Sequence, residues 1–201
     1  MQLRFLSLVV FFSFLYAFAH AQQERENKPT YVIGMNGQYG FIIPHSDELK
    51  QISESNPWGL SADFSKLLYS DKAWSNCNCY SKIGLSFAYY NYSNPKNLGN
   101  SYNLILFAEP FLSYQEKLHT TLRAGMGVTY LDKVYDEITN PENLFYSSPI
   151  SFILILQLKV NYTIDPNYKV YLSGNYNHIS NGAVEKPNKG MNFPTLGLGL
   201  E

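Results

Sequence analysis

The sequence has little charge, few cysteines and no excess of either sign. Charged residues make up 15% of the 201 residues, and the formal net charge is -1 at pH 7. Nucleic-acid-binding domains carry a basic patch, and disordered acidic tails carry runs of like charge. Neither class fits, and we expect no nucleic-acid partner. The four histidines are scattered along the chain, and two cysteines are too few for a structural zinc site. We therefore expect no metal and no cofactor.

The two cysteines, Cys77 and Cys79, are separated by a single residue. A disulfide between positions this close is geometrically strained. A redox or metal-binding role is one alternative, and free or locally oxidised cysteines in a loop are the other. The composition favours the second.

Long apolar runs are absent except at the N-terminus. Arg4 precedes an apolar run over 5–18, and Ala19-His20-Ala21 supplies the small residues of a cleavage site. This order is typical of a secretory signal peptide, and the run is shorter than the ~20 residues of a spanning helix. We expect a signal peptide at 1–21, a flexible polar leader at 22–29 and a mature domain at 30–201. An exported chain without a spanning helix is either secreted or a β-barrel.

Helical periodicity is absent as well, and extended segments take its place. Several of these segments are longer than the usual 5–6 residues of a soluble strand and suit the ~9–11 residues of a bilayer-spanning strand. The high aromatic share, 16% with 17 Tyr and 13 Phe, suits girdles at a bilayer interface. The sequence predicts an all-β protein, an eight-stranded antiparallel up-and-down transmembrane β-barrel of the bacterial outer membrane. The expected strands cover 30–43, 59–68, 82–92, 101–114, 118–131, 148–162, 168–181 and 192–201.

Alternation within these segments separates a polar face from an apolar face. In 148–162, one face is continuously apolar, while Gln157, Lys159 and Asn161 lie on the other. In 118–131, Arg123 shares its face with small residues. Because a narrow lumen needs small and polar side chains, the apolar faces should contact lipid. Eight strands leave room only for side chains, so we expect a filled interior without an open pore.

A tight turn at 115–117 would place Glu109 opposite Arg123, with both side chains pointing inward. We predict a buried ion pair between them. The alternative is a catalytic Glu109. The ion pair is favoured because a buried carboxylate needs a partner, and Arg123 supplies one.

The connections give the barrel a direction. The turns at 115–117 and 165–167 are short, whereas 44–58, 93–100, 132–147 and 182–191 are longer. Bacterial barrels have short periplasmic turns and long external loops. The connection 69–81 is long for a periplasmic turn. The segment 168–181 should run outward, so its end lies near the outer leaflet.

The stretch His178-Ile-Ser-Asn-Gly182 stands at this outer end. Side chains on a strand repeat with period two, so His178 and Ser180 share the apolar, outward face. Polar side chains directed at lipid carry a free-energy penalty, and such positions usually indicate a function. A serine is activated by a neighbouring base, usually histidine, and Asn181 with the amides around Gly182 could stabilise an oxyanion.

The same stretch, followed by Pro187-Asn-Lys-Gly190 and the terminal Thr195-Leu-Gly-Leu-Gly-Leu200, resembles the end of the outer-membrane lipid A 3-O-deacylase (PagL-type) family. The resemblance implies an eight-stranded barrel with a Ser-His-acid triad on its outer surface. It also implies hydrolysis of the ester-linked acyl chain at position 3 of lipid A, without a metal. The expected partners are lipid A or lipopolysaccharide and outer-membrane lipids, and a homodimer is left open.

By position, the resemblance assigns Ser180 as the nucleophile, His178 as the general base and Asn181 to the oxyanion hole. The family's carboxylate, 14 residues after the histidine, falls on Asn192. An amide oxygen can orient the imidazole but brings no charge to stabilise an imidazolium. Glu185 is an alternative third member, although it does not match the family position.

Two other functions stay open. The degenerate triad would suit a non-catalytic outer-membrane barrel that acts as an anchor or adhesin. A soluble ligand-binding barrel of the lipocalin kind is a third interpretation.

Overall fold

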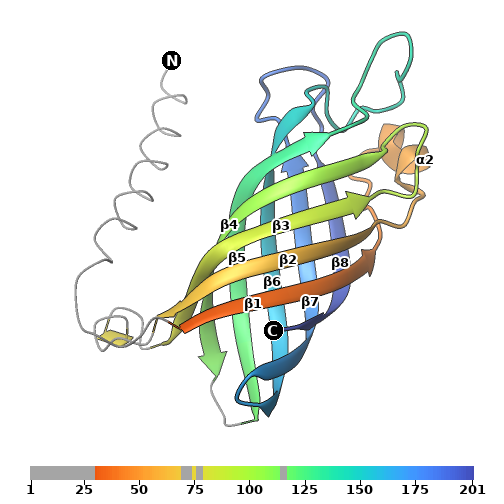
Figure 1. Cartoon of the computed structure of the whole chain (residues 1–201). Helices are drawn as coiled ribbons and strands as arrows, with labels where there is room; N and C mark the ends of the chain where they lie inside the picture. The colour runs from red at the N-terminus through yellow and green to blue at the C-terminus, as the bar shows by residue number, and fades with distance from the viewer. Residues whose placement is uncertain (1–29, 69–73, 76–78, 114–116) are drawn as a thin grey trace.

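The computed structural model describes residues 30–68, 74–75, 79–113 and 117–201. Eight antiparallel strands form a closed barrel in which each strand pairs with its neighbours in sequence and β1 pairs with β8 (Figure 1). This confirms the predicted fold class. The strands are β1 (Thr30–Gly40), β2 (Trp58–Leu68), β3 (Ser81–Asn91), β4 (Asn100–Ser113), β5 (Leu118–Leu131), β6 (Ile150–Asp165), β7 (Tyr168–Ser180) and β8 (Met191–Leu200).

The strand limits depart most from the expectation in β1 and β6. β1 ends at Gly40. Beyond it, the Phe41 amide donates to the Pro194 carbonyl at 3.2 Å, and an isolated bridge joins Ile43 to Asn192. β6 continues to Asp165, where the side chain accepts hydrogen bonds from the backbone amides of Asn167 and Tyr168 at 2.7 and 3.1 Å. This Asx-type turn closes the β6–β7 hairpin in two residues.

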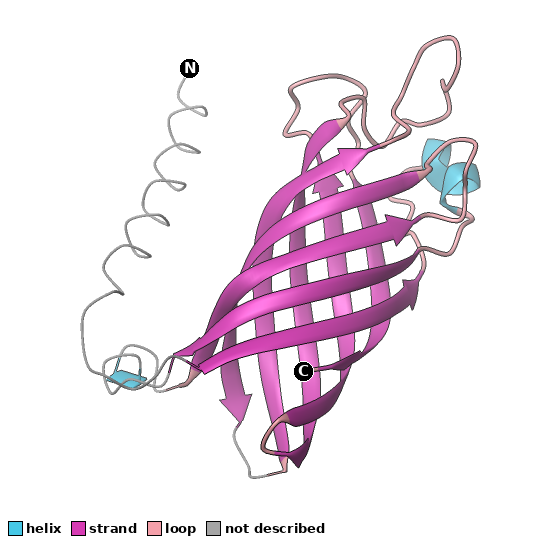
Figure 2. Ribbon diagram, viewed as in Figure 1, coloured by secondary structure: helices cyan, strands magenta, loops and turns pink. Residues whose placement is uncertain are grey.

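The barrel has two unlike ends. The long-loop end carries the connections 41–57, 92–99, 132–149 and 181–190, with two short helices, η2 (Asp47–Leu49) and α2 (Lys50–Ser53), in the first of them (Figure 2). These helices were not expected from the sequence. β7 runs from the β6–β7 turn toward the long-loop end, so Ser180 lies where the strand meets the loops.

Some predictions concern residues that the structure does not describe. The signal peptide (1–21), the leader (22–29) and Cys77 lie outside the described residues. Cys79 is disulfide-bonded. Among the described residues, no helix is long and apolar enough to cross a bilayer.

Side chains alternate between the interior and the outer surface as predicted. In β6, Gln157, Lys159 and Asn161 are buried, and the opposite face is exposed and apolar. Its members are Ile150, Phe152, Leu154, Leu156, Leu158 and Val160. A continuous apolar outer face is the pattern of a barrel that spans a membrane.

Aromatic rings form a row on the outer surface near the long-loop end. Trp58, Tyr89, Tyr102 and Tyr130 come from β2, β3, β4 and β5, and successive ring centroids lie 5.7, 5.4 and 6.4 Å apart. Amphipathic rings at one level of a barrel are typical of a girdle at the bilayer interface. The girdle accounts for part of the high aromatic content.

Six charged side chains form a buried cluster in the part of the barrel interior nearer the short turns. The predicted pair is confirmed, because Arg123 Nε donates to Glu109 Oε2 at 2.7 Å. Arg123 also pairs with Asp63 at 2.6 Å. Lys82 and Lys159 each bridge Glu109 and the Glu201 side chain, at 2.6–3.2 Å. Three cations therefore neutralise three anions in a place that water cannot easily solvate.

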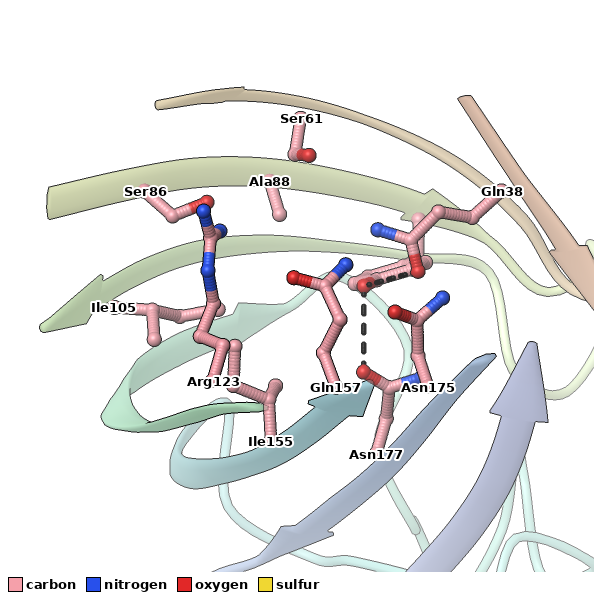
Figure 3. Close-up of a pocket in the computed structure, with 11 residues that line it drawn as sticks. Gln38, Ser61, Ser86, Ala88, Ile105, Arg123, Ile155, Gln157, Asn175 and Asn177 are labelled. Atoms are coloured by element: carbon pink, nitrogen blue, oxygen red, sulfur yellow. Dashed lines mark hydrogen bonds between the residues drawn. The ribbon is translucent and has the colours of Figure 1, made fainter. Parts of the chain in front are cut away.

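A polar cavity of about 20 Å³ lies next to the charge cluster, on the side of the long-loop end. It has room for about one water molecule. Arg123, Gln157 and Asn175 are among the side chains that line it (Figure 3). The Tyr90 hydroxyl donates to Gln38 Oε1 at 3.3 Å or to Asn177 Oδ1 at 3.4 Å. The interior is filled rather than open, as expected for eight strands.

An apolar plug closes the interior at the long-loop end. Strand residues such as Tyr90 and Phe193 pack there against Leu49, Leu98 and Phe145 from three different loops. Tyr146 is also fully buried, and its burial holds the pKa of the phenol above the ordinary value. The loops are therefore anchored in the barrel by their own apolar side chains.

Replacing Arg123 with Ala should lower the free energy of unfolding by about 3–5 kcal/mol, because two buried carboxylates lose a partner. Urea unfolding of the barrel in detergent micelles, followed by gel mobility, measures this change. Lys66→Ala on the exposed face of β2 is the matched control and should be nearly neutral. Loss of function in an Arg123→Ala barrel of unchanged stability would contradict the structural role.

Candidate active site

His178 and Ser180 lie on the outer face of β7, as their spacing predicts. Both are partly exposed, whereas Asn177, Ile179 and Asn181 between and beside them are buried. Two residues of strand span roughly 6.7 Å, so the two side chains are neighbours on one surface. The pair is thus accessible from outside the barrel.

Asn192 faces His178 across the β7–β8 ladder. The His178 Nδ1 and Asn192 Oδ1 atoms are 2.7 Å apart. An amide oxygen can only accept, so Nδ1 is the donor in this contact, and in the neutral ring Nε2 then keeps its lone pair. This is the tautomer that a general base needs.

Gly190 makes room for the histidine ring. A Cβ atom at this position would lie 2.9 Å from His178 Cε1 and 3.5 Å from His178 Nε2. Its φ of +72° is also a conformation that favours glycine. Any larger residue would displace the ring from its place beside Asn192.

The Ser180 hydroxyl is held by the following loop. Asn188 Nδ2 donates to Ser180 Oγ at 3.0 Å, and the Gly182 amide donates to the same oxygen at 3.2 Å. The Ser180 hydroxyl itself lies 3.4 Å from Asn188 Oδ1. In this resting arrangement the hydroxyl donates to Asn188 Oδ1, and within the described residues no hydrogen bond joins Ser180 to His178. Catalytic hydrogen bonds often form only when substrate is bound.

Asn181 lies on the other side of the strand end and is only 2% exposed. Its Nδ2 donates to Ser147 Oγ at 3.3 Å and to the Glu185 carbonyl at 3.0 Å, and its Oδ1 accepts from the Ala183 amide at 2.9 Å. The Glu185 side chain is exposed and makes no hydrogen bond or ion pair within the described part of the chain. The structure brings together His178, Ser180, Gly182 and Asn192, and it turns the Asn181 amide away from them.

Neighbouring loops fix the loop 181–190 from both sides. The Lys189 and Gly190 amides donate to the Leu144 and Phe145 carbonyls at 3.1 and 2.8 Å. The Lys189 ammonium forms an ion pair with Glu48 and donates to Ser46 Oγ at 3.3 Å. The connections 132–149 and 41–57 thus hold the loop that contacts Ser180.

Sequence reasoning gave no role to Asn188 or Gly190, although both stand in the Pro187–Gly190 stretch. Asn and Gly after Pro indicate a turn. A turn pattern does not predict which of its side chains forms a hydrogen bond with Ser180. The contact depends on how the loop folds back over the strand end.

An apolar groove of about 680 Å³ lies on the outer surface beside His178 and Asn192, on the side toward the short turns. Gly174 forms its floor, since a Cβ atom there would meet nothing within 4 Å. Tyr176 and Pro194 line the end nearest His178 and Asn192. The remaining wall is mainly apolar side chains of β5, β6, β8 and the end of β1, among them Phe41, Leu122, Leu156, Leu158 and Leu196.

Among the described residues, the hydrogen-bond partners of His178 and Ser180 are neutral: the Asn192 and Asn188 side chains and the Gly182 amide. Among the described residues, no group of three or more His, Cys, Asp or Glu side chains could hold a metal ion. The arrangement offers a hydroxyl, an oriented imidazole and hydrogen-bond donors at the mouth of an apolar groove. These are the groups that acyl transfer from a lipid ester requires.

Comparison with solved structures finds similar barrels at low sequence identity. The outer membrane enzyme PagL matches with a TM-score of 0.58 and 13% identity over 83% of this chain and 97% of that one. Neisserial surface protein A matches with a TM-score of 0.60 and 12% identity over 87% and 97%. A search of curated protein sequences finds no match. These likenesses show the fold alone.

A family model decides the relationship. The model described as lipid A 3-O-deacylase (PagL) matches residues 54–201, which cover β2 to β8 and include His178, Ser180 and Asn192. The match extends over well more than half of the 201 residues. This chain belongs to the lipid A 3-O-deacylase (PagL) family.

Proposed function

We propose that this protein is an outer-membrane serine esterase that hydrolyses the 3-O-linked acyl chain of lipid A. The observation that carries the proposal is the oriented His178–Asn192 pair, which shares the outer face of the barrel with Ser180. Family membership supplies the substrate class. The apolar groove beside Tyr176 offers a place for the acyl chain outside the barrel.

In the first half of the reaction, Ser180 Oγ attacks the ester carbonyl carbon and His178 Nε2 accepts the hydroxyl proton. The carbonyl oxygen takes up the negative charge. When the intermediate collapses, the bond to the sugar oxygen breaks and that oxygen takes the proton from Nε2. The acyl chain is left as an ester on Ser180.

In the second half, water attacks the acyl-enzyme and loses a proton to His178 Nε2. The Ser180 oxygen leaves and regains that proton, which releases the fatty acid. Throughout, Asn192 Oδ1 holds the Nδ1 proton and keeps the ring in one orientation. Asn192 acts through His178 and is a positioning residue.

The second candidate is a non-catalytic barrel. Two observations favour it: Asn192, at the position of the third triad member, is an uncharged amide, and the Ser180 hydroxyl donates to Asn188 Oδ1 rather than to His178. A fluorophosphonate probe that labels reactive serines separates the two candidates. Labelling of Ser180 favours the esterase.

Replacing Ser180 with Ala should abolish deacylation, because the nucleophile is removed and the barrel is not. Mass spectrometry of lipid A from cells with and without the expressed protein measures the lost acyl chain. Ser173→Ala on the inner face of the same strand is the matched control and should leave the product unchanged. Persistent deacylation by Ser180→Ala would disprove the nucleophile.

Replacing Asn192 with Glu should preserve or raise kcat, because a carboxylate accepts the same Nδ1 proton and also stabilises the imidazolium. Asn192→Leu should lower kcat strongly while the barrel still folds. Rates of fatty-acid release from lipopolysaccharide micelles measure both. Equal activity in the Leu variant and the unsubstituted protein would exclude Asn192 from the site.

Replacing Gly174 with Leu should fill the groove floor and lower hydrolysis of long-chain esters by about tenfold or more, roughly the worth of 1–3 kcal/mol of apolar contact. Short-chain p-nitrophenyl esters should react at the unchanged rate. Leu172→Phe, on the same face but outside the groove, is the control. Equal losses for short and long esters would argue against an acyl-binding groove.

A further inference from the structure

Lys189 stands between the two loop residues that lie against the catalytic pair. The residue before it, Asn188, donates to Ser180 Oγ at 3.0 Å. The residue after it, Gly190, is so close to His178 that an added Cβ atom would lie 2.9 Å from the ring. Consecutive Cα atoms are about 3.8 Å apart, so the Lys189 side chain starts beside the reacting groups. The mechanism proposed above gives its positive charge no role.

Two groups of the 41–57 connection hold the Lys189 ammonium. It forms an ion pair with the Glu48 carboxylate and donates to Ser46 Oγ at 3.3 Å. We propose that Lys189 and Ser46 bind a phosphate group of the lipid A sugar backbone, and that this phosphate takes the place of Glu48. This role rests on the proposed esterase function and adds a part of the substrate, other than the acyl chain, that the protein recognises.

The Lys189–Glu48 ion pair is accessible to a ligand. The exposed fraction is 32% for the Lys189 side chain and 64% for the Glu48 side chain. Exposed ion pairs contribute little to stability, because water solvates both charges. A phosphate monoester carries a charge of about −1.5 to −2 at neutral pH, which exceeds that of a carboxylate. It can therefore displace Glu48 from the ammonium.

The Ser46 hydroxyl supplies a second donor beside the ammonium. Its oxygen accepts from Lys189, and within the described part of the chain its own hydrogen has no acceptor. Ser46 directly precedes η2 but makes no side-chain capping bond to that helix. A hydroxyl can accept and donate at the same time, so Ser46 can keep the bond from Lys189 and also donate to a phosphate oxygen. An ammonium with an adjacent hydroxyl suits a phosphate group.

Only side chains have to move when Glu48 leaves. The Lys189 backbone amide donates to the Leu144 carbonyl at 3.1 Å, which fixes this part of the loop 181–190 independently of the ion pair. Leu49, next to Glu48, is fully buried in the apolar plug and anchors the 41–57 connection. A site whose backbone is fixed before binding loses less conformational entropy when the ligand binds.

The position of the two donors suits the layout of the substrate. Lipid A is an acyl ester of a phosphorylated glucosamine disaccharide, so the ester and the phosphates share one small sugar backbone. The apolar groove lies on the side of the catalytic pair toward the short turns, whereas Lys189 and Ser46 belong to loops at the long-loop end (Figure 2). With the acyl chain in the groove, the sugar and its phosphates lie toward these loops.

The test compares lipid A, the same lipid A after enzymatic removal of its phosphates, and p-nitrophenyl butyrate, all in one detergent. The unsubstituted protein should prefer the phosphorylated form. Lys189→Gln should remove this preference by raising KM for the phosphorylated form about tenfold, roughly the value of a hydrogen bond to a charged group. The kcat should change little, because the contact is lost equally from the ground state and the transition state.

Glu48→Gln should have the opposite effect on the phosphorylated form. It removes the carboxylate that competes for the ammonium, so KM should fall. If the ion pair only holds the loop, Lys189→Gln and Glu48→Gln both break it and should change all three substrates in the same direction. That result, or an unchanged KM in Lys189→Gln, overturns the proposal.

Lys186→Gln is the matched control, because it removes the same charge from an exposed position of the same loop. It should keep the preference for the phosphorylated form. An equal loss in this variant would indicate a general attraction between the loop and anionic micelles, and it would overturn the specific role of Lys189.

Binding to the inactive Ser180→Ala barrel separates this proposal from the esterase itself. Calorimetry should show tighter binding of phosphorylated than of phosphate-free lipid A, and an added Lys189→Gln should abolish the difference. That result without any hydrolysis by the unsubstituted protein would exclude the esterase and leave the phosphate site intact. Equal binding of both forms would exclude the phosphate site, whatever the rate of hydrolysis. Competition by inorganic phosphate at the concentration of the lipid would indicate a site for free phosphate and overturn its assignment to lipid A.

Discussion

The buried charge cluster around Glu109 is the constraint on which the rest of the barrel depends. Its members come from β2, β3, β4, β5 and β6 and from the residue after β8. A slip of one residue in any of these strands would turn a charge toward lipid, because side chains alternate with period two. That is far less favourable than a neutral cluster inside. The cluster therefore sets the register, and the register decides which side chains face outward.

The polar side chains at the outer end of β7 and β8 are exceptions to this division. In a barrel whose outer face is apolar, His178 and Asn192 satisfy each other across the ladder, and Ser180 is satisfied by the loop. These hydrogen bonds lower the penalty of placing His178, Ser180 and Asn192 on the outer face. The groove below the pair begins at Tyr176 and Pro194, so polar chemistry and apolar binding share one pair of strands.

Period-two alternation and turn length were enough to predict the eight strands, their register at Glu109–Arg123 and the outward position of His178, Ser180 and Asn192. Those features depend on local spacing and on one tight turn. The two short helices, the apolar plug and the Asn188 contact could not be obtained in this way, because they arise where loops distant in sequence pack together. Asn181 shows the limit well. Its place next to Ser180 could be read from the sequence, whereas its hydrogen bonds to Ser147, the Glu185 carbonyl and the Ala183 amide could not, because they depend on how the loop folds.

Asn192 is neutral where the triad has a carboxylate, and this changes which groups can stabilise charge in the proposed reaction. In a triad with a carboxylate, the negative charge beside the imidazole stabilises the imidazolium that forms when the ring accepts the serine proton. In the esterase proposed above, the Asn192 amide orients the ring only, so proton transfer from Ser180 to His178 would create a cation without a counter-charge beside it. The negative charge on the carbonyl oxygen of the ester would then be the nearest charge of opposite sign. The proposed chemistry therefore depends on a loop that keeps its shape at the surface of the barrel. Asn181 braces the loop 181–190 through Ser147 and the Glu185 carbonyl, and Asn188 connects the loop to Ser180.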